Sequence, residues 1–145
     1  MKDISEKQAA ENGISTRHTD MENGEIRYRL IGADNSSYIR TEAYKSCWEN
    51  AHFHMNCKEM YIVQRGTIYF CELKDNQIFV KKMREGDYTI TSPNVIHNVH
   101  MCKDAIVHTV KFGDCENNDW HGSDKLLCLK DLTLEELNIM AEKNI

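Results

Sequence analysis

Residues 52–66 read HFHMNCKEMYIVQRG. His52 and His54 are separated by one residue, and in a strand this spacing places both imidazoles on the same face of a sheet. Glu59 follows after a short turn and begins the next expected strand, on which Tyr61 shares its face. The stretch therefore brings two imidazoles and one carboxylate, all of them metal-ligating groups, to the junction of two strands.

A second stretch, residues 86–97, reads GDYTITSPNVIH. Gly86 opens a strand, and His97 follows eleven residues later, just after the turn at Ser92 and Pro93. Together with the first stretch, this gives three imidazoles and one carboxylate, a mixed set suited to divalent Fe, Mn, Co, Ni or Zn. Such a set leaves coordination positions for water or substrate, as a catalytic metal requires.

Short segments of alternating apolar residues surround both stretches. About eight of them are separated by turn residues, with no long helical pattern in between. They cover residues 26–31, 38–48, 59–64, 67–73, 77–83, 87–91, 98–102 and 106–112. This spacing predicts an all-β protein, an antiparallel sandwich or barrel.

The two ends of the chain differ from this central part. Residues 1–25 are polar, and we expect a loose lead-in with a short helix over residues 6–12. Thr133 and Glu136 have the spacing of a capping box, which predicts a short helix over residues 134–143. We expect this helix to cap an open end of the barrel or to pack on a neighbouring subunit. The expected organisation is a lead-in, one barrel domain and a C-terminal extension, over residues 1–25, 26–115 and 116–145.

The two quoted stretches resemble the two conserved motifs of the cupin superfamily. Residues 52–66 match the first motif, H-x-H-x4-E-x6-G, and residues 86–97 match the second with its interval from glycine to histidine. The resemblance covers about residues 38–112. It implies a jelly-roll barrel, or double-stranded β-helix, that binds one divalent metal ion per chain through His52, His54, Glu59 and His97.

Three departures from the family pattern do not touch the ligands. Ser46 stands where the first motif usually begins with glycine, and Met101 replaces an asparagine that usually follows the second motif. Ser92 and Asn94 replace the usual proline and glycine of a turn. Asparagine tolerates the left-handed backbone that glycine would supply, so the fold expectation stands.

Strand alternation supplies candidates for substrate binding. Met101 shares the face of His97, and Trp48 lies just before the first motif, where it would line the mouth of the barrel or fill its core. Arg40 and Tyr44 lie on one polar face of the preceding strand. If that face is inward, Arg40 could bind a substrate carboxylate or phosphate through two nitrogens; if it is outward, these are ordinary solvated side chains.

Tyr61 and His108 are the candidates for catalysis. Tyr61 shares its face with Glu59, and His108 shares one with Ile106 and Val110, whose apolar character favours an inward orientation. His108 would then be an acid or base near the metal, or a hydrogen-bonded core histidine. His100 lies on the opposite face of the strand from His97, so we expect it at the surface.

Composition excludes several classes of protein. The 145 residues suit one domain, and a net charge of −5 without a basic stripe argues against nucleic-acid binding. No apolar run approaches the ~20 residues that cross a bilayer, and the polar N-terminal residues do not have the pattern of a secretory signal. Six cysteines without a C-x-x-C pair favour reduced thiols in the cytoplasm.

Two functions remain open from the sequence. The first is a small metalloenzyme that acts on a sugar, sugar phosphate, keto acid or similar polar substrate, as an isomerase, decarboxylase or dioxygenase. The second is a non-catalytic module that binds or senses a small molecule at the metal. The resemblance to cupins also suggests a homodimer, which would protect exposed strand edges.

Overall fold

The structure is a computed structural model, and it describes residues 5–115 and 119–144. Strands make up most of it, with a helix near each end. In chain order the elements are α1 (Glu6–Glu11), β1 (Ser15–Thr16), β2 (Thr19–Asp20), β3 (Glu25–Ile31), β4 (Ser37–Ala43), β5 (Cys47–Trp48), β6 (His52–Phe53), β7 (Cys57–Arg65), β8 (Thr67–Lys74), β9 (Gln77–Arg84), β10 (Tyr88–Ile90), β11 (Ile96–Met101), β12 (Ile106–Gly113), β13 (His121–Gly122), the 3-10 helix η1 (Leu127–Asp131) and α2 (Leu134–Lys143).

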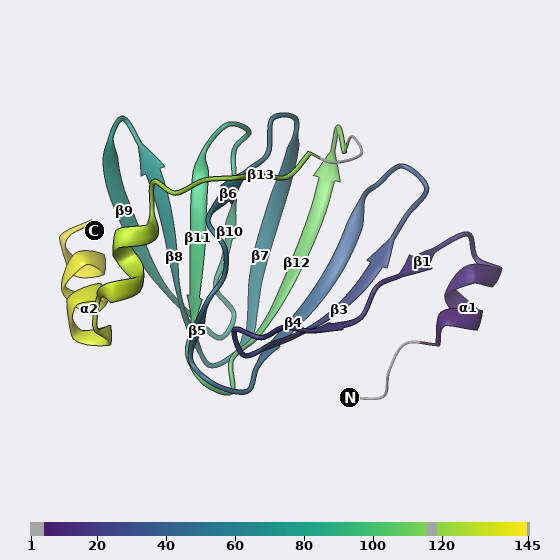
Figure 1. Ribbon diagram of the computed structural model, residues 1–145, viewed down its shortest axis with the longest axis horizontal. Helices are drawn as coiled ribbons and strands as arrows, with labels where there is room; N and C mark the ends of the chain where they lie inside the picture. Colours follow the sequence, from purple (N-terminus) through teal and green to yellow (C-terminus); the bar gives the residue numbers. More distant parts are fainter. Residues whose placement is uncertain (1–4, 116–118, 145) are drawn as a thin grey trace.

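The strands form two antiparallel sheets. One sheet has seven strands, in the order β1-β3-β4-β12-β7-β10, with β2 also paired to β3. The other has six strands, in the order β13-β6-β11-β8-β9, with β5 also paired to β11. Figure 1 shows α1 beyond the β1 and β3 side of the barrel and α2 beyond the β9 side. The all-β antiparallel barrel predicted from the sequence, with its short C-terminal helix, is confirmed.

The core lies between the sheets, and β7 shows why the sequence folds this way. Its residues alternate between buried and more exposed along most of the strand, as a half-buried strand requires. Tyr61 and Val63 point inward and pack in one cluster with residues of the opposite sheet, including Phe70 and Val99. Because Glu59 has the same parity, the alternation that builds the core also turns the motif glutamate inward.

Gly66 ends β7 and has a steric reason to be glycine. Its φ is +82°, a left-handed conformation that glycine adopts without strain. A Cβ at this position would also lie 2.9 Å from Cα of Ala105. Asn94 has a φ of +64°, which confirms the prediction that asparagine serves in that turn where glycine is usual.

The structure differs from the expected strands in two places. The expected strand over residues 38–48 is split into β4 and β5, because β4 pairs within the seven-stranded sheet and β5 joins the other sheet through β11. The expected loose lead-in is also partly wrong. Residues 15–16 and 19–20 form β1 and β2, which pair with β3. Two-residue bridges have no apolar alternation for sequence reasoning to detect.

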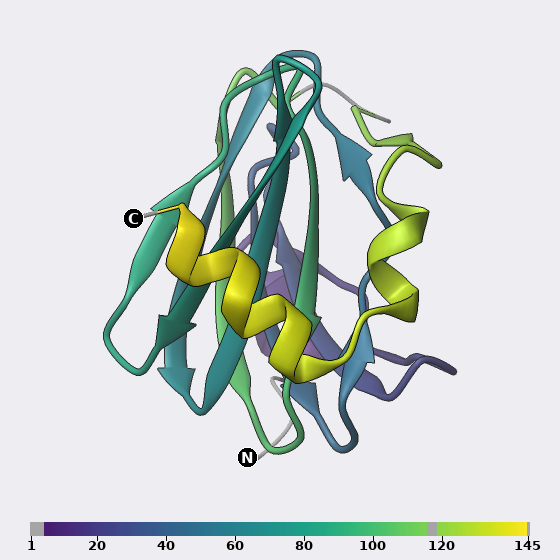
Figure 2. The same cartoon turned by 90° about the vertical axis from the view of Figure 1, so that its left-hand side faces the viewer.

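Helix α2 begins and ends as predicted, with the Thr133–Glu136 capping box present. It crosses in front of the β9 side of the barrel (Figure 2). Its buried residues Leu137 and Ala141 join a second cluster on the outer face of the six-stranded sheet, with Tyr69 and Val80. The helix therefore covers a sheet face of its own barrel and does not cap an open end. Within the described ranges, no helix has the length and apolar character to cross a bilayer.

Candidate metal centre

Both sheets contribute to a cluster of the four candidate ligands. His52 in β6 and His97 in β11 are directly paired across these antiparallel strands. His54 follows β6, and Glu59 lies near the start of β7 in the opposite sheet. All four residues are buried, and one ligand atom of each lies within 4.8 Å of those of the others. Residues up to 45 positions apart in the chain are thus joined at one point between the sheets.

One carboxylate oxygen of Glu59 lies at the centre of this cluster. Its Oε2 atom is 3.4 Å from Nε2 of His52, 3.2 Å from Nε2 of His54 and 3.0 Å from Nε2 of His97. The hydroxyl of Tyr61 donates a hydrogen bond to the same oxygen at 2.9 Å. On the other side, Nζ of Lys111 lies 3.4 Å from Oε1.

The opposite ring nitrogens of the three histidines face main-chain carbonyls. A carbonyl only accepts, so each Nδ1 carries a proton and each Nε2 presents a lone pair to the cluster. Metal-binding histidines are commonly oriented by such contacts. The three pairs are His52 with Asn50 at 2.8 Å, His97 with Val95 at 3.0 Å, and His54 with Asp119.

The chemistry of this donor set fits a divalent cation. Three nitrogen lone pairs that converge on a carboxylate oxygen repel it unless a positive charge lies among them. Nε2 of His54 is buried without a hydrogen-bond partner among the described residues, which is costly in the absence of an ion. The four residues could therefore hold one metal ion, with nitrogen and oxygen donors of the kind that Mn, Fe, Co, Ni and Zn accept.

Burial and neighbouring charge act in opposite directions on these groups. Burial alone would raise the pKa of Glu59, but its close contacts with the three imidazoles and the charge of Lys111 hold it well below its usual range. Burial lowers the pKa of His52. Burial also works to lower the pKa of His97, but its contact with Glu59 outweighs this and raises it. Glu59 is therefore a carboxylate, as a ligand must be.

Asp119 supports the first motif from a distant part of the chain. Its carboxylate accepts hydrogen bonds from the main-chain N–H groups of Met55, Asn56 and Cys57, at 2.7, 3.0 and 3.0 Å. These bonds hold the pKa of Asp119 below its usual range against the opposing effect of burial. Through its carbonyl the same residue also orients His54. Asp119 thus fixes the loop that carries two of the ligands, and no local sequence signal reveals this.

A cavity of about 460 Å³ opens beside the cluster, within the size range of small-molecule sites. His52, Glu59 and Tyr61 lie in its wall, with Lys111. Trp120 stands at the same cavity, half exposed, and its ring stacks on His52 with centroids 5.3 Å apart. The candidate centre is therefore accessible to a small molecule from one side.

Of the candidate catalytic residues, the structure brings Tyr61 to the cluster and not His108. A β-bulge between Ile106 and Val107 changes the phase of β12, so that Val107 is buried in the core. Thr109 and Lys111 then line the cavity, and His108 points outward. Its ring nitrogens contact the Tyr38 hydroxyl at 2.8 Å and the Gln64 side chain at 2.7 Å. The expectation that the face of His108 is inward is wrong because a bulge is not visible in the sequence.

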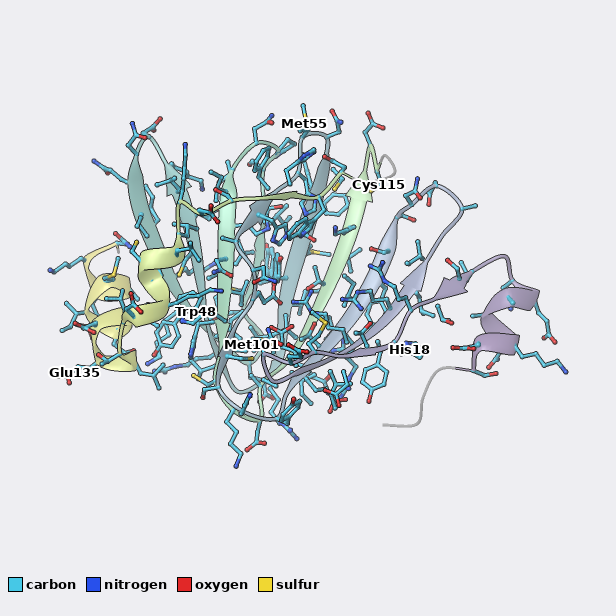
Figure 3. All side chains as sticks on the ribbon, in the orientation of Figure 1. His18, Trp48, Met55, Met101, Cys115 and Glu135 are labelled. Atoms are coloured by element: carbon cyan, nitrogen blue, oxygen red, sulfur yellow. The ribbon has the colours of Figure 1, made fainter. Side chains whose placement is uncertain are left out.

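The candidate substrate-binding residues do not line the cavity. Arg40 faces outward and pairs with Glu42. The outward orientation is the second of the two alternatives above, although neighbouring side chains largely bury Arg40 and it is not solvated. Tyr44 is exposed, and Met101 is fully buried in the core between the sheets. Trp48 packs on the outer cluster, on the side that faces the C-terminal helix (Figure 3).

Two further buried residues, His100 and Cys57, lie outside the set of ligands. His100 lies on the opposite face from His97, as predicted, but it is buried and not at the surface. It packs against Trp48 and Tyr69, with ring centroids 5.1 and 6.0 Å away, beneath the C-terminal segment. Cys57 lines the cavity, yet burial raises the pKa of its thiol to about 12, so it does not supply a thiolate nucleophile.

No protein-family model and no curated protein sequence matches this chain. Solved structures do match. KdgF from Halomonas sp. is 13% identical with a TM-score of 0.58, over 71% of this chain and 89% of that one. An uncharacterised conserved protein with a double-stranded beta-helix domain from Klebsiella pneumoniae is 14% identical with a TM-score of 0.60, over 73% of this chain and 90% of that one.

A single-residue variant of oxalate decarboxylase from Bacillus subtilis is also similar. It is 14% identical with a TM-score of 0.64, over 86% of this chain, but this chain spans only 37% of the length of that protein. Identities this low establish the fold alone. Together with the two motifs and the two-sheet barrel, they show that the protein has the cupin fold, a double-stranded β-helix.

Proposed function

We propose that the protein is a metal-dependent enzyme in which His52, His54, Glu59 and His97 bind one divalent ion. The observation that carries this proposal is the convergence of three Nε2 atoms within 3.0–3.4 Å of one buried carboxylate oxygen. Each opposite Nδ1 is already occupied by a carbonyl, so the donors are arranged before any ion binds. One structure of the similar Bacillus subtilis oxalate decarboxylase is described by its Mn(II) centres, which supports Mn among the candidate ions.

The residues beside the cluster suit chemistry on a small polar molecule. A divalent ion bound there would polarise an oxygen of the substrate. Tyr61 keeps its proton, because burial first and the charge of Glu59 next raise its pKa, and it orients Glu59 through their hydrogen bond. Lys111 reaches the same carboxylate from the cavity side and is placed to donate a hydrogen bond to a substrate oxygen. Isomerisation, decarboxylation and dioxygen-dependent cleavage all remain candidate reactions.

Metal content tests the ligand assignment. We expect about one divalent ion per chain, by elemental analysis of protein purified without chelators or added metal. His52→Ala and Glu59→Ala should lose most of it, because each removes one of four donors. His108→Ala is the matched control, since this histidine lies on the outer face. Wild-type protein with well under one ion per chain, or full occupancy in both ligand variants, would contradict the proposal.

Catalysis needs a separate test against the alternative of a non-catalytic binding or sensing module. Sugar phosphates, small keto acids and catechols should be screened for turnover with the Fe, Mn, Ni and Zn forms. If the protein is an enzyme, at least one combination of substrate and metal form should show turnover. Lys111→Met should then reduce kcat while metal content is retained. A compound that raises the melting temperature without turnover by any metal form would instead favour the binding module.

We further propose that the protein is a homodimer. Tyr88 and Ile90, on edge strand β10, are 61% and 46% exposed. They continue an outer sheet face on which Met60 and Ile62 are only half-buried. Light scattering coupled to gel filtration should give about twice the chain mass of 16.9 kDa, and Ile90→Lys should shift it toward the monomer. A monomeric wild-type protein would refute this.

The cysteines support a cytoplasmic location. All six are free thiols, and four of them are buried. Because disulfides form and persist in oxidising compartments, a chain with six unpaired cysteines suits a reducing one. Fractionation of the source cells should find the protein in the cytoplasm; recovery from the medium with formed disulfides would contradict this.

A further inference from the structure

Arg29 is a buried cation in the wall of the cavity. It lies on β3, is 8% exposed, and faces the same space as the candidate metal cluster. Its guanidinium donates to the Thr19 hydroxyl at 3.0 Å and to the main-chain carbonyl of Arg17 at 3.5 Å. Both partners are neutral, and across residues 5–115 and 119–144 no carboxylate forms an ion pair with Arg29.

The neighbouring Arg27 shows what a paired arginine looks like in the same cavity. Its guanidinium lies 2.6 Å from Glu25 and 3.3 Å from Glu49, so two carboxylates share its charge. Burial, followed by the charges of Arg27 and Arg17, lowers the pKa of Arg29 to about 10. A buried charge without a counter-ion is costly, and an anion bound beside it would remove much of that cost.

The described lining of the cavity is positive as a whole. Its four cationic side chains exceed its three carboxylates by one charge, and a divalent ion at the cluster would raise this excess to three. The cations are Arg17, Arg27, Arg29 and Lys111, and the carboxylates are Glu49, Glu59 and Asp119. A cavity of this character attracts anions and disfavours neutral or cationic molecules.

Strand register places Arg29 in line with Tyr61, three strands away in the same sheet. Arg29 pairs with Ile39 on β4, Ile39 with Thr109 on β12, and Thr109 with Tyr61 on β7. Adjacent strands lie about 4.8 Å apart, so β3 and β7 are roughly 14 Å apart along the sheet. Arg29 and the cluster residues His52 and Glu59 line the same cavity, so one small molecule bound in it can approach both.

We propose that Arg29, with Arg17 beside it, binds an oxyanion group of the substrate, a carboxylate or a phosphate, while the other end of the same molecule reaches the His52–Glu59 cluster. The inference rests on the proposed metal site for the second contact only. Arginine suits this role because its planar guanidinium donates two parallel hydrogen bonds to an oxyanion. Substrates of the site are therefore small organic anions, and neutral sugars are excluded.

Succinate is a suitable probe, because it carries an oxyanion at each end of a four-carbon molecule. Its diamide, succinamide, is the matched neutral control, and inorganic phosphate distinguishes the two oxyanions. Calorimetric titration should be done with Mn²⁺-loaded protein and with chelator-treated protein. We expect succinate to bind both forms, more tightly with metal, and succinamide to bind neither. Phosphate that binds more tightly than succinate, with the same dependence on Arg29, would assign the subsite to a phosphate group.

Arg29→Gln should weaken succinate binding about 10- to 100-fold in both forms, the loss expected for hydrogen bonds between charged groups. Arg84→Gln is the control, because it removes the same charge from an exposed position on β9. Arg17→Gln removes an exposed side chain and should weaken binding less. If Arg29→Gln does not fold, Arg17→Gln decides the question, and undiminished affinity in that variant overturns the proposal.

Three other results would also overturn it: unchanged succinate affinity in folded Arg29→Gln, equal affinity for succinate and succinamide, or no binding of either anion to the wild type. Failure of the metal proposal gives a different pattern. In that case the protein takes up no Mn²⁺, yet succinate binding still depends on Arg29. Conversely, if the protein binds metal but Arg29→Gln and Arg84→Gln have the same succinate affinity, the metal site stands and the anion subsite is refuted.

Discussion

The two faces of strand β11 each bury a histidine, and they do so in different ways. On the cavity face, His97 has a carbonyl at one nitrogen and the Glu59 carboxylate at the other. On the outer face, Nδ1 of His100 is buried without a hydrogen-bond partner among the described residues, beneath the cover formed by the C-terminal segment. Burial of a histidine therefore does not mark a site; the donors and acceptors arranged around it do.

The contrast extends to the neighbours of each ring. The cavity face adds Tyr61, Lys111 and a fixed loop around His97 and Glu59, all of which are polar and directed at one point. The outer face places His100 against Trp48 and Tyr69, two rings that pack in one cluster with apolar residues of η1 and α2. The cavity face therefore has the converging polar groups of a binding site, whereas the outer face has the apolar groups that hold a helix against a sheet.

Exchanging each histidine for alanine should separate these roles most strongly. His97→Ala removes one of four ligands and should weaken metal binding by about 100-fold or more, if four ligands share ~10–16 kcal/mol of binding free energy. His100→Ala should retain the metal but lose about 2 kcal/mol of stability, through the cavity that it leaves. Competition with a chelator of known affinity measures the first effect, and urea unfolding measures the second.

The same pair of variants can break the comparison. Metal loss in His100→Ala as large as in His97→Ala would show that the outer face holds the site in shape, so that the two faces form one functional unit. Full metal affinity in His97→Ala would remove the second motif from the site altogether.

Asp119 offers a second, smaller test, because it supports the cavity face from outside the two motifs. Asp119→Asn keeps the size of the side chain but removes the charge that three main-chain N–H groups share. We expect metal affinity to fall about 10- to 100-fold, as for other residues that orient ligands, with a stability loss of about 1–3 kcal/mol. Asp124→Asn, at an exposed position, is the control and should change neither quantity.

A purely structural role for Asp119 gives a different result. Stability would then fall while the metal affinity of the folded fraction stays at the wild-type value. This outcome would reassign the residue from the site to the fold.

The sequence predicted the cavity face better than its surroundings, for a physical reason. His52, His54 and Glu59 lie within eight residues, where the period of a strand and one short turn decide which way side chains point. The phase of β12 depends instead on a bulge at Ile106 and Val107. Alternation extended from Ile106 therefore predicted an inward side chain at His108 and gave no reason to expect Lys111 in the cavity.

Substrate-binding candidates failed for a related reason. Arg40 on β4 and Arg29 on β3 both lie on polar, alternating strands, and local pattern does not say which face of either strand is inward. Pairing decides this, because Ile39 is opposite both Arg29 and Thr109 in the sheet. The chemistry expected of Arg40, recognition of an oxyanion, is thus reassigned to an arginine on the neighbouring strand. The role of Asp119 could not be predicted from local sequence at all, because its partners are more than 60 residues away in the chain.

The smallest expected effect is the response of the outer face to acid. Burial lowers the pKa of His100, so the folded protein favours the neutral ring, whereas an unfolded chain protonates it near pH 6.5. Below that pH the unfolded state binds more protons, and stability should fall as the pH decreases toward the folded pKa. His100→Phe replaces the unpaired ring with an apolar one and should change stability by less than about 1 kcal/mol at neutral pH. Urea unfolding of both proteins from pH 8 to 5 should show a smaller loss of stability in acid for the variant. Parallel curves of stability against pH would mean that His100 does not titrate on unfolding. The two faces of β11 would then differ in ligands but not in electrostatics.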